Sequence, residues 1–142
     1  MRKVLVAVDG SENAERAVRF VAEKSGWDKE GLEVHLLNVQ MPLAGVNVKM
    51  FISQDSLNDY YRDAGAVALA RSRELLDAAG IRNEHHIGVG DPAEVIAEYA
   101  EAKACDHVVV GSRGMGAVAG MVLGSVATKV MRLAKVPVTL VK

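Results

Sequence analysis

The feature that most restricts the fold of this chain is a regular alternation between short apolar runs and longer segments of helical periodicity. The apolar runs are rich in valine and show little polar alternation, which is typical of strands covered on both faces. They occupy residues 3–8, 33–39, 83–89, 107–110 and 137–141. Apolar residues recur at helical spacing between them, over 12–24, 54–79, 92–103 and 123–134.

This alternation predicts an α/β fold with a single-domain, open, parallel five-stranded sheet and helices on both faces, because strand–helix–strand crossovers are right-handed. No linker, repeat or low-complexity tract interrupts the pattern, so we expect one domain over 1–142. Ligands of such sheets bind beyond the C-terminal ends of the strands. The turns that begin at Asp9, Gln40 and Gly111 are therefore the places to expect a site.

Local signals predict where the helices begin and end. Ser11 and Asp91 are good N-caps, and Pro92 suits the first position of the helix that follows. Gly65, inside the segment 54–79, leaves open whether that predicted helix is continuous, because glycine weakens a helix interior. Residues 40–53 are irregular and predict a surface excursion.

The composition excludes several classes of protein. Half of the residues are hydrophobic and a quarter are charged, as in globular domains and unlike disordered chains. The net charge of −1 gives no overall basic field, so we expect no nucleic-acid partner. No apolar run approaches the ~20 residues of a membrane span, and the first run has the pattern of a strand, not of a signal peptide. We therefore expect a cytoplasmic protein without a membrane span.

A glycine-rich segment follows the fourth predicted strand, over residues 111–125. Its backbone can approach a ligand closely, and its N–H groups can form an anion-binding nest. Ser125 lies where the next helix begins, a position that suits a phosphate. Residues 107–142 contain five basic residues and no acidic one, which favours an anionic ligand. Glycines at such turns also allow a helix to pack closely on the sheet. These residues alone therefore do not decide whether the glycines bind phosphate or serve packing.

The spacing within this segment is specific. The P-loop pattern is absent, because no glycine is followed by Lys-Ser or Lys-Thr. The arrangement Gly111-x2-Gly114-x9-Gly124-Ser125 instead resembles the signature of the universal stress protein family, in its ATP-binding branch. Three further segments are similar to that family, in the same order along the chain: 6–11, 90–92 and 136–138.

The resemblance implies a Rossmann-like sheet of the adenine nucleotide alpha hydrolase type, with strand order 3-2-1-4-5. It implies that ATP, ADP or AMP binds, with Mg²⁺ or Mn²⁺ held indirectly by Asp9 through the nucleotide phosphates. It also implies a homodimer joined through the strand 136–141, and a regulatory switch in stress response that acts on a further protein partner. The resemblance implies slow ATP hydrolysis at most, without dedicated catalytic residues.

The resemblance also assigns roles to strand-end residues. Ala7 and Val8 would flank the nucleotide, Asp9 would lie by the ribose and phosphates, and Val39 would offer backbone hydrogen bonds to adenine. Five residues of the glycine-rich segment, together with the residue that follows it, would hold the ribose and phosphates: Gly111, Arg113, Gly114, Gly124, Ser125 and Val126.

Two other functions remain open on the sequence. A nucleotide-independent adaptor dimer would use the glycines for packing alone. An adenylating or pyrophosphate-releasing enzyme of a related fold is disfavoured, because such enzymes place a Ser-Gly-Gly run after strand one and this chain has Asp9-Gly10-Ser11-Glu12.

Two groups of potentially reactive side chains predict no site. Neighbours on a strand point to opposite faces, so His85 and His86 are not expected to bind one metal ion together. Cys105 has no partner for a disulfide or a Cys-built zinc site, and we expect a small packed side chain.

Overall fold

The computed structural model describes residues 2–43, 52–114 and 123–142. Two predicted segments lie largely outside the described residues: the interior of the glycine-rich segment, 115–122, and most of the excursion predicted over 40–53. The strands are β1 (Arg2–Ala7), β2 (Leu32–Gln40), β3 (Arg82–Val89), β4 (His107–Gly111) and β5 (Val138–Val141). The α-helices are α1 (Glu12–Arg19), α3 (Gln54–Ala78), α4 (Pro92–Ala102) and α5 (Ser125–Leu133).

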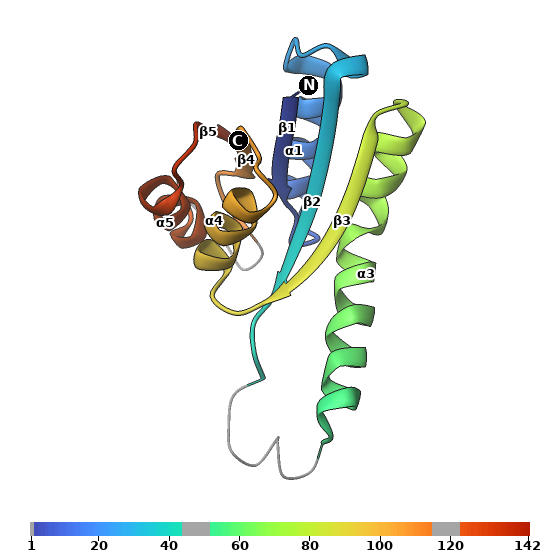
Figure 1. The fold of residues 1–142 in the computed structure, drawn as a ribbon, viewed down its shortest axis with the longest axis vertical. Coiled ribbons are helices and arrows are strands. Elements are labelled where there is room, and N and C mark those ends of the chain that lie inside the picture. The colour runs from blue at the N-terminus through green and yellow to red at the C-terminus, as the bar shows by residue number, and fades with distance from the viewer. Residues whose placement is uncertain (1, 44–51, 115–122) are drawn as a thin grey trace.

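The strands form one sheet in the order β3-β2-β1-β4-β5, and every neighbouring pair is parallel (Figure 1). The predicted α/β architecture and its strand order 3-2-1-4-5 are thereby confirmed. Parallel pairing brings the C-terminal ends of all strands to one edge of the sheet, where the chain order reverses between β1 and β4.

Helices cover both faces of the sheet. α1 and α3 pack on one face, over a buried cluster that includes Val4, Val6 and Leu36. α4 and α5 pack on the other face, over a cluster that includes Leu5 and Leu37. Successive residues of β1 and β2 thus enter opposite layers, as the pleat of a strand requires.

The predicted helix starts are confirmed in detail. The Ser11 hydroxyl accepts a hydrogen bond from the backbone N–H of Ala14 (3.1 Å), and the Asp91 carboxylate accepts one from Glu94 (3.1 Å). The first helix does not remain α-helical to residue 24, because Phe20–Lys24 form π-helical turns. A short 3₁₀ turn, Lys29–Gly31, then leads into β2.

The helix predicted over 54–79 is confirmed, and α3 runs without interruption through Gly65, from Gln54 to Ala78. A Cβ atom at residue 65 would lie 2.7 Å from the side chain of Ile87 on β3. The absent side chain therefore allows the helix to approach the sheet closely, and this packing outweighs the weak helix propensity of glycine.

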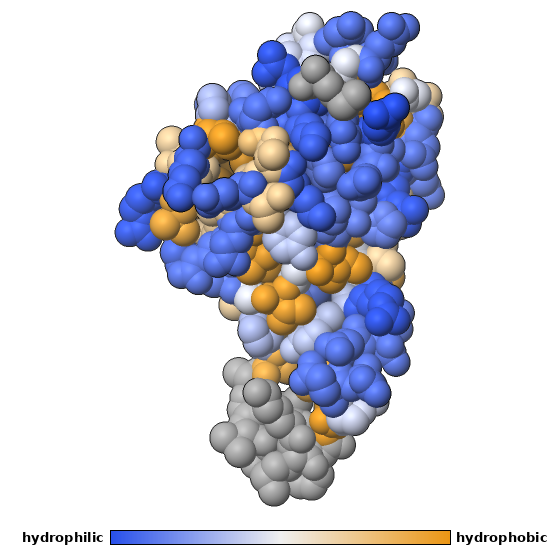
Figure 2. Space-filling model, in the orientation of Figure 1, coloured by the Kyte–Doolittle hydropathy of each residue, from blue (hydrophilic) through white to orange (hydrophobic). Residues whose placement is uncertain are grey.

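The exposed surface differs between the body of the protein and the edge where the strands end. Figure 2 shows hydrophilic side chains over most of the visible face and apolar ones around the C-terminal ends of the strands. Met41 and Val89, which lie after the end of β2 and at the end of β3, are 69% and 46% exposed.

None of the helices in the described ranges is long and apolar enough to cross a membrane.

Candidate functional site

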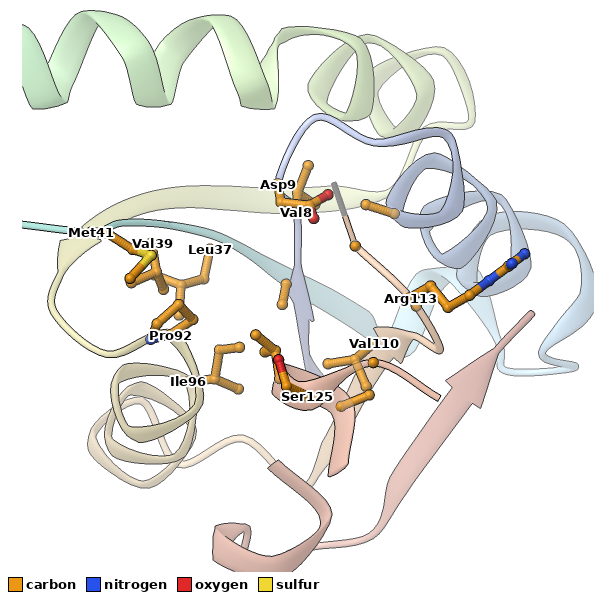
Figure 3. Close-up of a pocket in the computed structure, with 17 residues that line it drawn as sticks. Val8, Asp9, Leu37, Val39, Met41, Pro92, Ile96, Val110, Arg113 and Ser125 are labelled. Atoms are coloured by element: carbon orange, nitrogen blue, oxygen red, sulfur yellow. The ribbon is translucent and has the colours of Figure 1, made fainter. Parts of the chain in front are cut away.

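A cavity of about 330 Å³ lies at the C-terminal edge of the sheet, between the ends of β1, β2 and β4 and the beginnings of α4 and α5 (Figure 3). Every one of the ten residues predicted from the sequence lines it: Ala7, Val8, Asp9, Val39, Gly111, Arg113, Gly114, Gly124, Ser125 and Val126. Seven lining residues were not predicted: Ala14, Leu37, Met41, Pro92, Ile96, Val110 and Ala127. Most of these seven are apolar core or helix residues, whose position over the cavity depends on the packing of α1, α4 and α5.

One wall of the cavity is formed by the turn after β1. The carboxylate of Asp9 accepts a hydrogen bond from the backbone N–H of Ser11 through Oδ1 (3.0 Å). Gly10 has φ +86°, a left-handed conformation that glycine adopts without strain and that this turn requires. A Cβ atom at Gly114 would lie 2.6 Å from Asp9 Oδ2, so a side chain at this position would require the carboxylate to shift.

The end of β2 presents backbone groups to the cavity. In a parallel sheet the N–H and C=O groups of one residue point to the same neighbouring strand, and successive residues alternate between the two neighbours. Leu37 accepts from the N–H of Val8 on the β1 side (2.8 Å), and Gln40 accepts from Gly90 on the β3 side (3.0 Å). The N–H and C=O of Val39 therefore point to the β1 side, beyond the last residue of that strand.

A buried asparagine holds the glycine loop in place. Asn13, in the first turn of α1, is 6% exposed. Its Oδ1 accepts from the backbone N–H of Arg113 (2.7 Å), and its Nδ2 donates to the carbonyl of Val141 (3.0 Å). A Cβ atom at Gly111 would lie 2.5 Å from this Oδ1. The sequence analysis did not predict a role for Asn13. A signal was present, because Asn13 lies four residues before Ala17 and is therefore a polar residue on the apolar face of α1.

The N-terminus of α5 faces the cavity from the other side. Gly124 precedes the helix, and its N–H donates to the carbonyl of Ser112 (2.6 Å). No side chain of the described residues caps this helix, so the N–H groups of its first turn are directed at the cavity. Figure 3 shows the Ser125 side chain across the cavity from Asp9. Uncapped N–H groups together with the positive end of the helix dipole suit an anion.

A model of the universal stress protein family matches residues 1–142. The chain belongs to the universal stress protein family. Universal stress protein MJ0531 of Methanocaldococcus jannaschii is 28% identical over 99% of this chain and 82% of its own length. YxiE of Bacillus subtilis is 29% identical over 99% of this chain and 98% of its own length.

Solved structures of universal stress proteins have the same fold. Protein MJ0577 of M. jannaschii matches with a TM-score of 0.84 and 28% identity, over 99% of this chain and 95% of its own. A family member from Arabidopsis thaliana with AMP bound matches with a TM-score of 0.73 and 25% identity, over 100% and 92%. The protein from Archaeoglobus fulgidus in complex with dAMP matches with a TM-score of 0.65 and 25% identity, over 100% and 98%.

The basic residues of this universal stress protein contribute less to the cavity than their number in the sequence suggests. Lys129 pairs with Asp91 on α4 (3.0 Å), and Lys135 pairs with Glu101 (3.4 Å). The hydrogen bond from Lys129 also lowers the pKa of the Asp91 carboxyl. Of the five basic residues in the last quarter of the chain, Arg113 alone is among the described residues that line the cavity. Figure 3 shows its guanidinium extending away from the other labelled side chains.

Few ionisable side chains line the described part of the cavity. Asp9 and Arg113 are the only ionisable side chains among its described lining residues, and the walls are otherwise backbone, Ser125 and apolar groups. A carboxylate pair for acid–base work is therefore absent from this described lining. The thiol of Cys105 is buried elsewhere, in the core on the α4 side, and desolvation raises its pKa to about 11, which keeps it protonated and unreactive.

Proposed function

We propose that this universal stress protein binds an adenine nucleotide, ATP or its products ADP and AMP, in the cavity at the C-terminal edge of the sheet. The observation that carries the proposal is the convergence of Asp9, the glycine loop, the uncapped start of α5 and the outward-facing backbone of Val39 around one cavity. Together these four features offer partners to the adenine base and to the phosphates of a nucleotide.

Each part of the nucleotide has a chemical counterpart. The N–H and C=O of Val39 offer a donor and an acceptor to the edge of adenine, beside the apolar side chains of Leu37 and Met41. The phosphates lie against the N–H groups at the start of α5, with the Ser125 hydroxyl as a further donor. Relatives with AMP and with dAMP bound support adenine as the base.

Asp9 also fits a divalent cation. Mg²⁺ in nucleotide sites is held by one or two carboxylates together with phosphate oxygens and water, and Asp9 is the carboxylate among the described lining residues. Bound there, Mg²⁺ or Mn²⁺ would neutralise charge on the phosphates. Asp9 would hold the ion and keep it on the side of the cavity that faces Gly114.

Regulation, rather than turnover, is the role we propose. The described lining contains no second carboxylate that could activate a water molecule, so hydrolysis is slow at most. Asn13 joins the glycine loop to Val141 at the end of β5, an edge strand of the sheet. Ordering of the loop by nucleotide therefore reaches the strand through which we propose that two copies pair, in the cytoplasm, to engage a regulatory partner.

Two measurements test this proposal. Calorimetry with ATP, AMP and GTP should give one site per chain, with both adenine nucleotides preferred to GTP. Chromatography of the supernatant from heat-denatured protein should detect an adenine nucleotide that co-purifies. Absence of binding in the first measurement would leave a nucleotide-independent adaptor, and release of pyrophosphate from ATP with an added carboxylic acid would indicate an adenylating enzyme.

A further inference from the structure

Two histidines from different strands meet on the face of the sheet that α4 covers. In the parallel register of β2 and β3, His35 lies opposite Glu84 and Leu37 lies opposite His86. Glu84 and His86 are two residues apart on β3, so their side chains share a face. Together with His35 they form what we call the histidine cluster: His35, Glu84 and His86.

The polar atoms of the histidine cluster converge on one point. His35 Nδ1 lies 3.0 Å from His86 Nε2 and 3.5 Å from the nearer carboxylate oxygen of Glu84. The same Glu84 oxygen lies 3.9 Å from His86 Nε2. A tetrahedral Zn²⁺ ion, with bonds of about 2.0–2.1 Å to nitrogen, separates its ligand atoms by about 3.3 Å. The observed separations therefore differ from those of three zinc ligands by only a few tenths of an ångström.

A second carboxylate orients the buried histidine. The side chain of His35 is 3% exposed, and its Nε2 lies 3.1 Å from a carboxylate oxygen of Glu33. An ionised carboxylate only accepts hydrogen bonds, so His35 carries its proton on Nε2 and keeps a lone pair on Nδ1. Metal-binding histidines commonly have this arrangement, in which a carboxylate holds the far ring nitrogen and fixes the tautomer.

We propose that the histidine cluster binds a divalent transition-metal ion, with Zn²⁺ as the preferred ion. His35 Nδ1, His86 Nε2 and a Glu84 oxygen are the protein ligands, and water takes the fourth position. Two imidazoles with one carboxylate suit zinc better than Mg²⁺ or Ca²⁺, which prefer oxygen donors. The side chain of Glu84 is 58% exposed, which leaves an entry path from the edge of the sheet.

Without metal, the same atoms form a hydrogen bond. His86 Nε2–H then donates to the lone pair of His35 Nδ1, with the ring planes within 7° of parallel. To bind the ion, His86 carries its ring proton on Nδ1 and offers the Nε2 lone pair instead.

The ion would fasten the edge of the sheet. Among the described strands, β3 is an outer strand and pairs with β2 alone. Ligands from both strands would add a cross-strand link on the face where His86 also contacts the ring of Tyr99 on α4, with centroids 5.7 Å apart. This site shares no ligand with the nucleotide cavity, so the inference does not rest on the proposed function.

The test uses the full chain, stripped of metal with a chelator and free of nucleotide. Calorimetric titration with Zn²⁺ should give one ion per chain, and Co²⁺ should produce the visible absorption of tetrahedral cobalt. Mg²⁺ in excess should not compete. Saturating Zn²⁺ should raise the melting temperature, because an ion that binds only the folded state stabilises it.

Variants identify the ligands. Glu84→Gln and His86→Ala should each weaken Zn²⁺ binding at least tenfold and abolish the cobalt absorption. His85→Ala is the matched control. The exposed side chain of His85 points from the opposite face of β3, so its removal should not change Zn²⁺ binding. Glu84→Gln replaces an exposed carboxylate and removes no core contact, so it remains informative if His86→Ala does not fold.

Three results would overturn the proposal. The first is no stoichiometric Zn²⁺ binding by the unaltered chain. The second is equal Zn²⁺ affinity in the unaltered chain and in Glu84→Gln. The third is a loss of affinity in His85→Ala as large as that in His86→Ala, which would place the metal elsewhere on the surface.

Discussion

Strand β2 carries two candidate sites that are built in opposite ways. Beyond its C-terminal end, the nucleotide cavity is formed largely by main chain: Val39, the glycine loop and the start of α5. Nearer its N-terminal end, the histidine cluster is formed entirely by side chains from two strands. The first region depends on an absence of side chains at glycines, whereas the second depends on three specific side chains meeting across a strand pair.

This difference teaches how each region can be disturbed on its own. A side chain added at a glycine of the loop should prevent nucleotide binding and leave the histidine cluster intact. Removal of a side chain from the histidine cluster should prevent Zn²⁺ binding and leave the cavity intact. Nucleotide affinity and Zn²⁺ affinity are therefore two independent readouts on one chain. The comparison fails if one substitution changes both to the same degree.

The largest expected effect follows from Gly114→Val. The added Cβ would lie 2.6 Å from Asp9 Oδ2, so the valine would fill the gap between the loop and the carboxylate. We expect the affinity for ATP to fall about 100-fold or more, about 2.7 kcal/mol, in calorimetry. Gly31→Val is the matched control, because nothing lies within 4 Å of its Cβ position. Normal ATP binding by Gly114→Val would remove the loop from the site, and a parallel loss of Zn²⁺ binding would break the comparison.

Asn13→Ala should weaken both the fold and the cavity. The substitution removes two partly buried hydrogen bonds and leaves the N–H of Arg113 and the carbonyl of Val141 without this partner. We expect the free energy of unfolding in urea to fall by about 1–3 kcal/mol, with weaker ATP binding and unchanged Zn²⁺ binding. Asn58→Ala, an exposed asparagine on α3, provides the control. Equal stability of the two variants would show that Asn13 does not hold the loop.

Arg113→Ala should have a modest effect on nucleotide binding. The guanidinium extends away from the other labelled lining side chains (Figure 3), so its charge attracts the phosphates without a fixed contact. We expect ATP affinity to fall by less than tenfold, under about 1.4 kcal/mol, and less at high salt. Arg132→Ala removes an exposed arginine of α5 that does not line the cavity and should change nothing. A loss as large as that in Gly114→Val would mean that side chains, not main chain, carry phosphate recognition.

The smallest expected effect concerns His107, a histidine that belongs to neither region. Burial first, and then the charge of Arg2, lower its pKa in the folded state, with Asp106 opposing. At a pH above the ordinary histidine pKa of about 6.5, the ring is neutral in both the folded and the unfolded chain. At a lower pH the unfolded chain binds the proton more readily than the folded chain. The free energy of unfolding therefore falls as the pH drops. Urea unfolding at pH 8 and pH 5 should show a smaller pH-dependent loss for His107→Gln than for the unaltered chain. An identical loss in both would assign the pH dependence to other groups.

The parts of the molecule that the sequence predicts are those set by local pattern. Alternating strand and helix signals are enough for the parallel sheet, and the glycine spacing with the strand ends is enough for the cavity, because parallel topology brings those ends together. Gly65 shows the limit of local reasoning. Its packing against Ile87 depends on the distance between α3 and β3, and the propensity of glycine alone predicts the opposite result.

Features that depend on register or on contacts between elements could not be predicted. His35 and His86 are separated by 51 residues in the sequence. Only the register of β2 and β3, which pairs His35 with Glu84, brings the two rings close together. The basic residues at the end of the chain suggested a positively charged cavity for an anionic ligand, but Lys129 is paired with Asp91 across the α4–α5 interface. Charge counted along a sequence does not show which carboxylates will neutralise it.

The two hydrogen bonds of Asn13 have a practical consequence for following ligand occupancy by spectroscopy. One amide side chain separates the loop beside Arg113 from the carbonyl of Val141, and Arg16 holds the carbonyl of Lys142 through its Nε at 3.1 Å. A fluorescent or spin label at residue 142 would therefore lie next to Val141, which a single side chain connects to the loop at Arg113, while leaving the cavity itself unmodified. Such a label would report on filling and emptying of the site in real time.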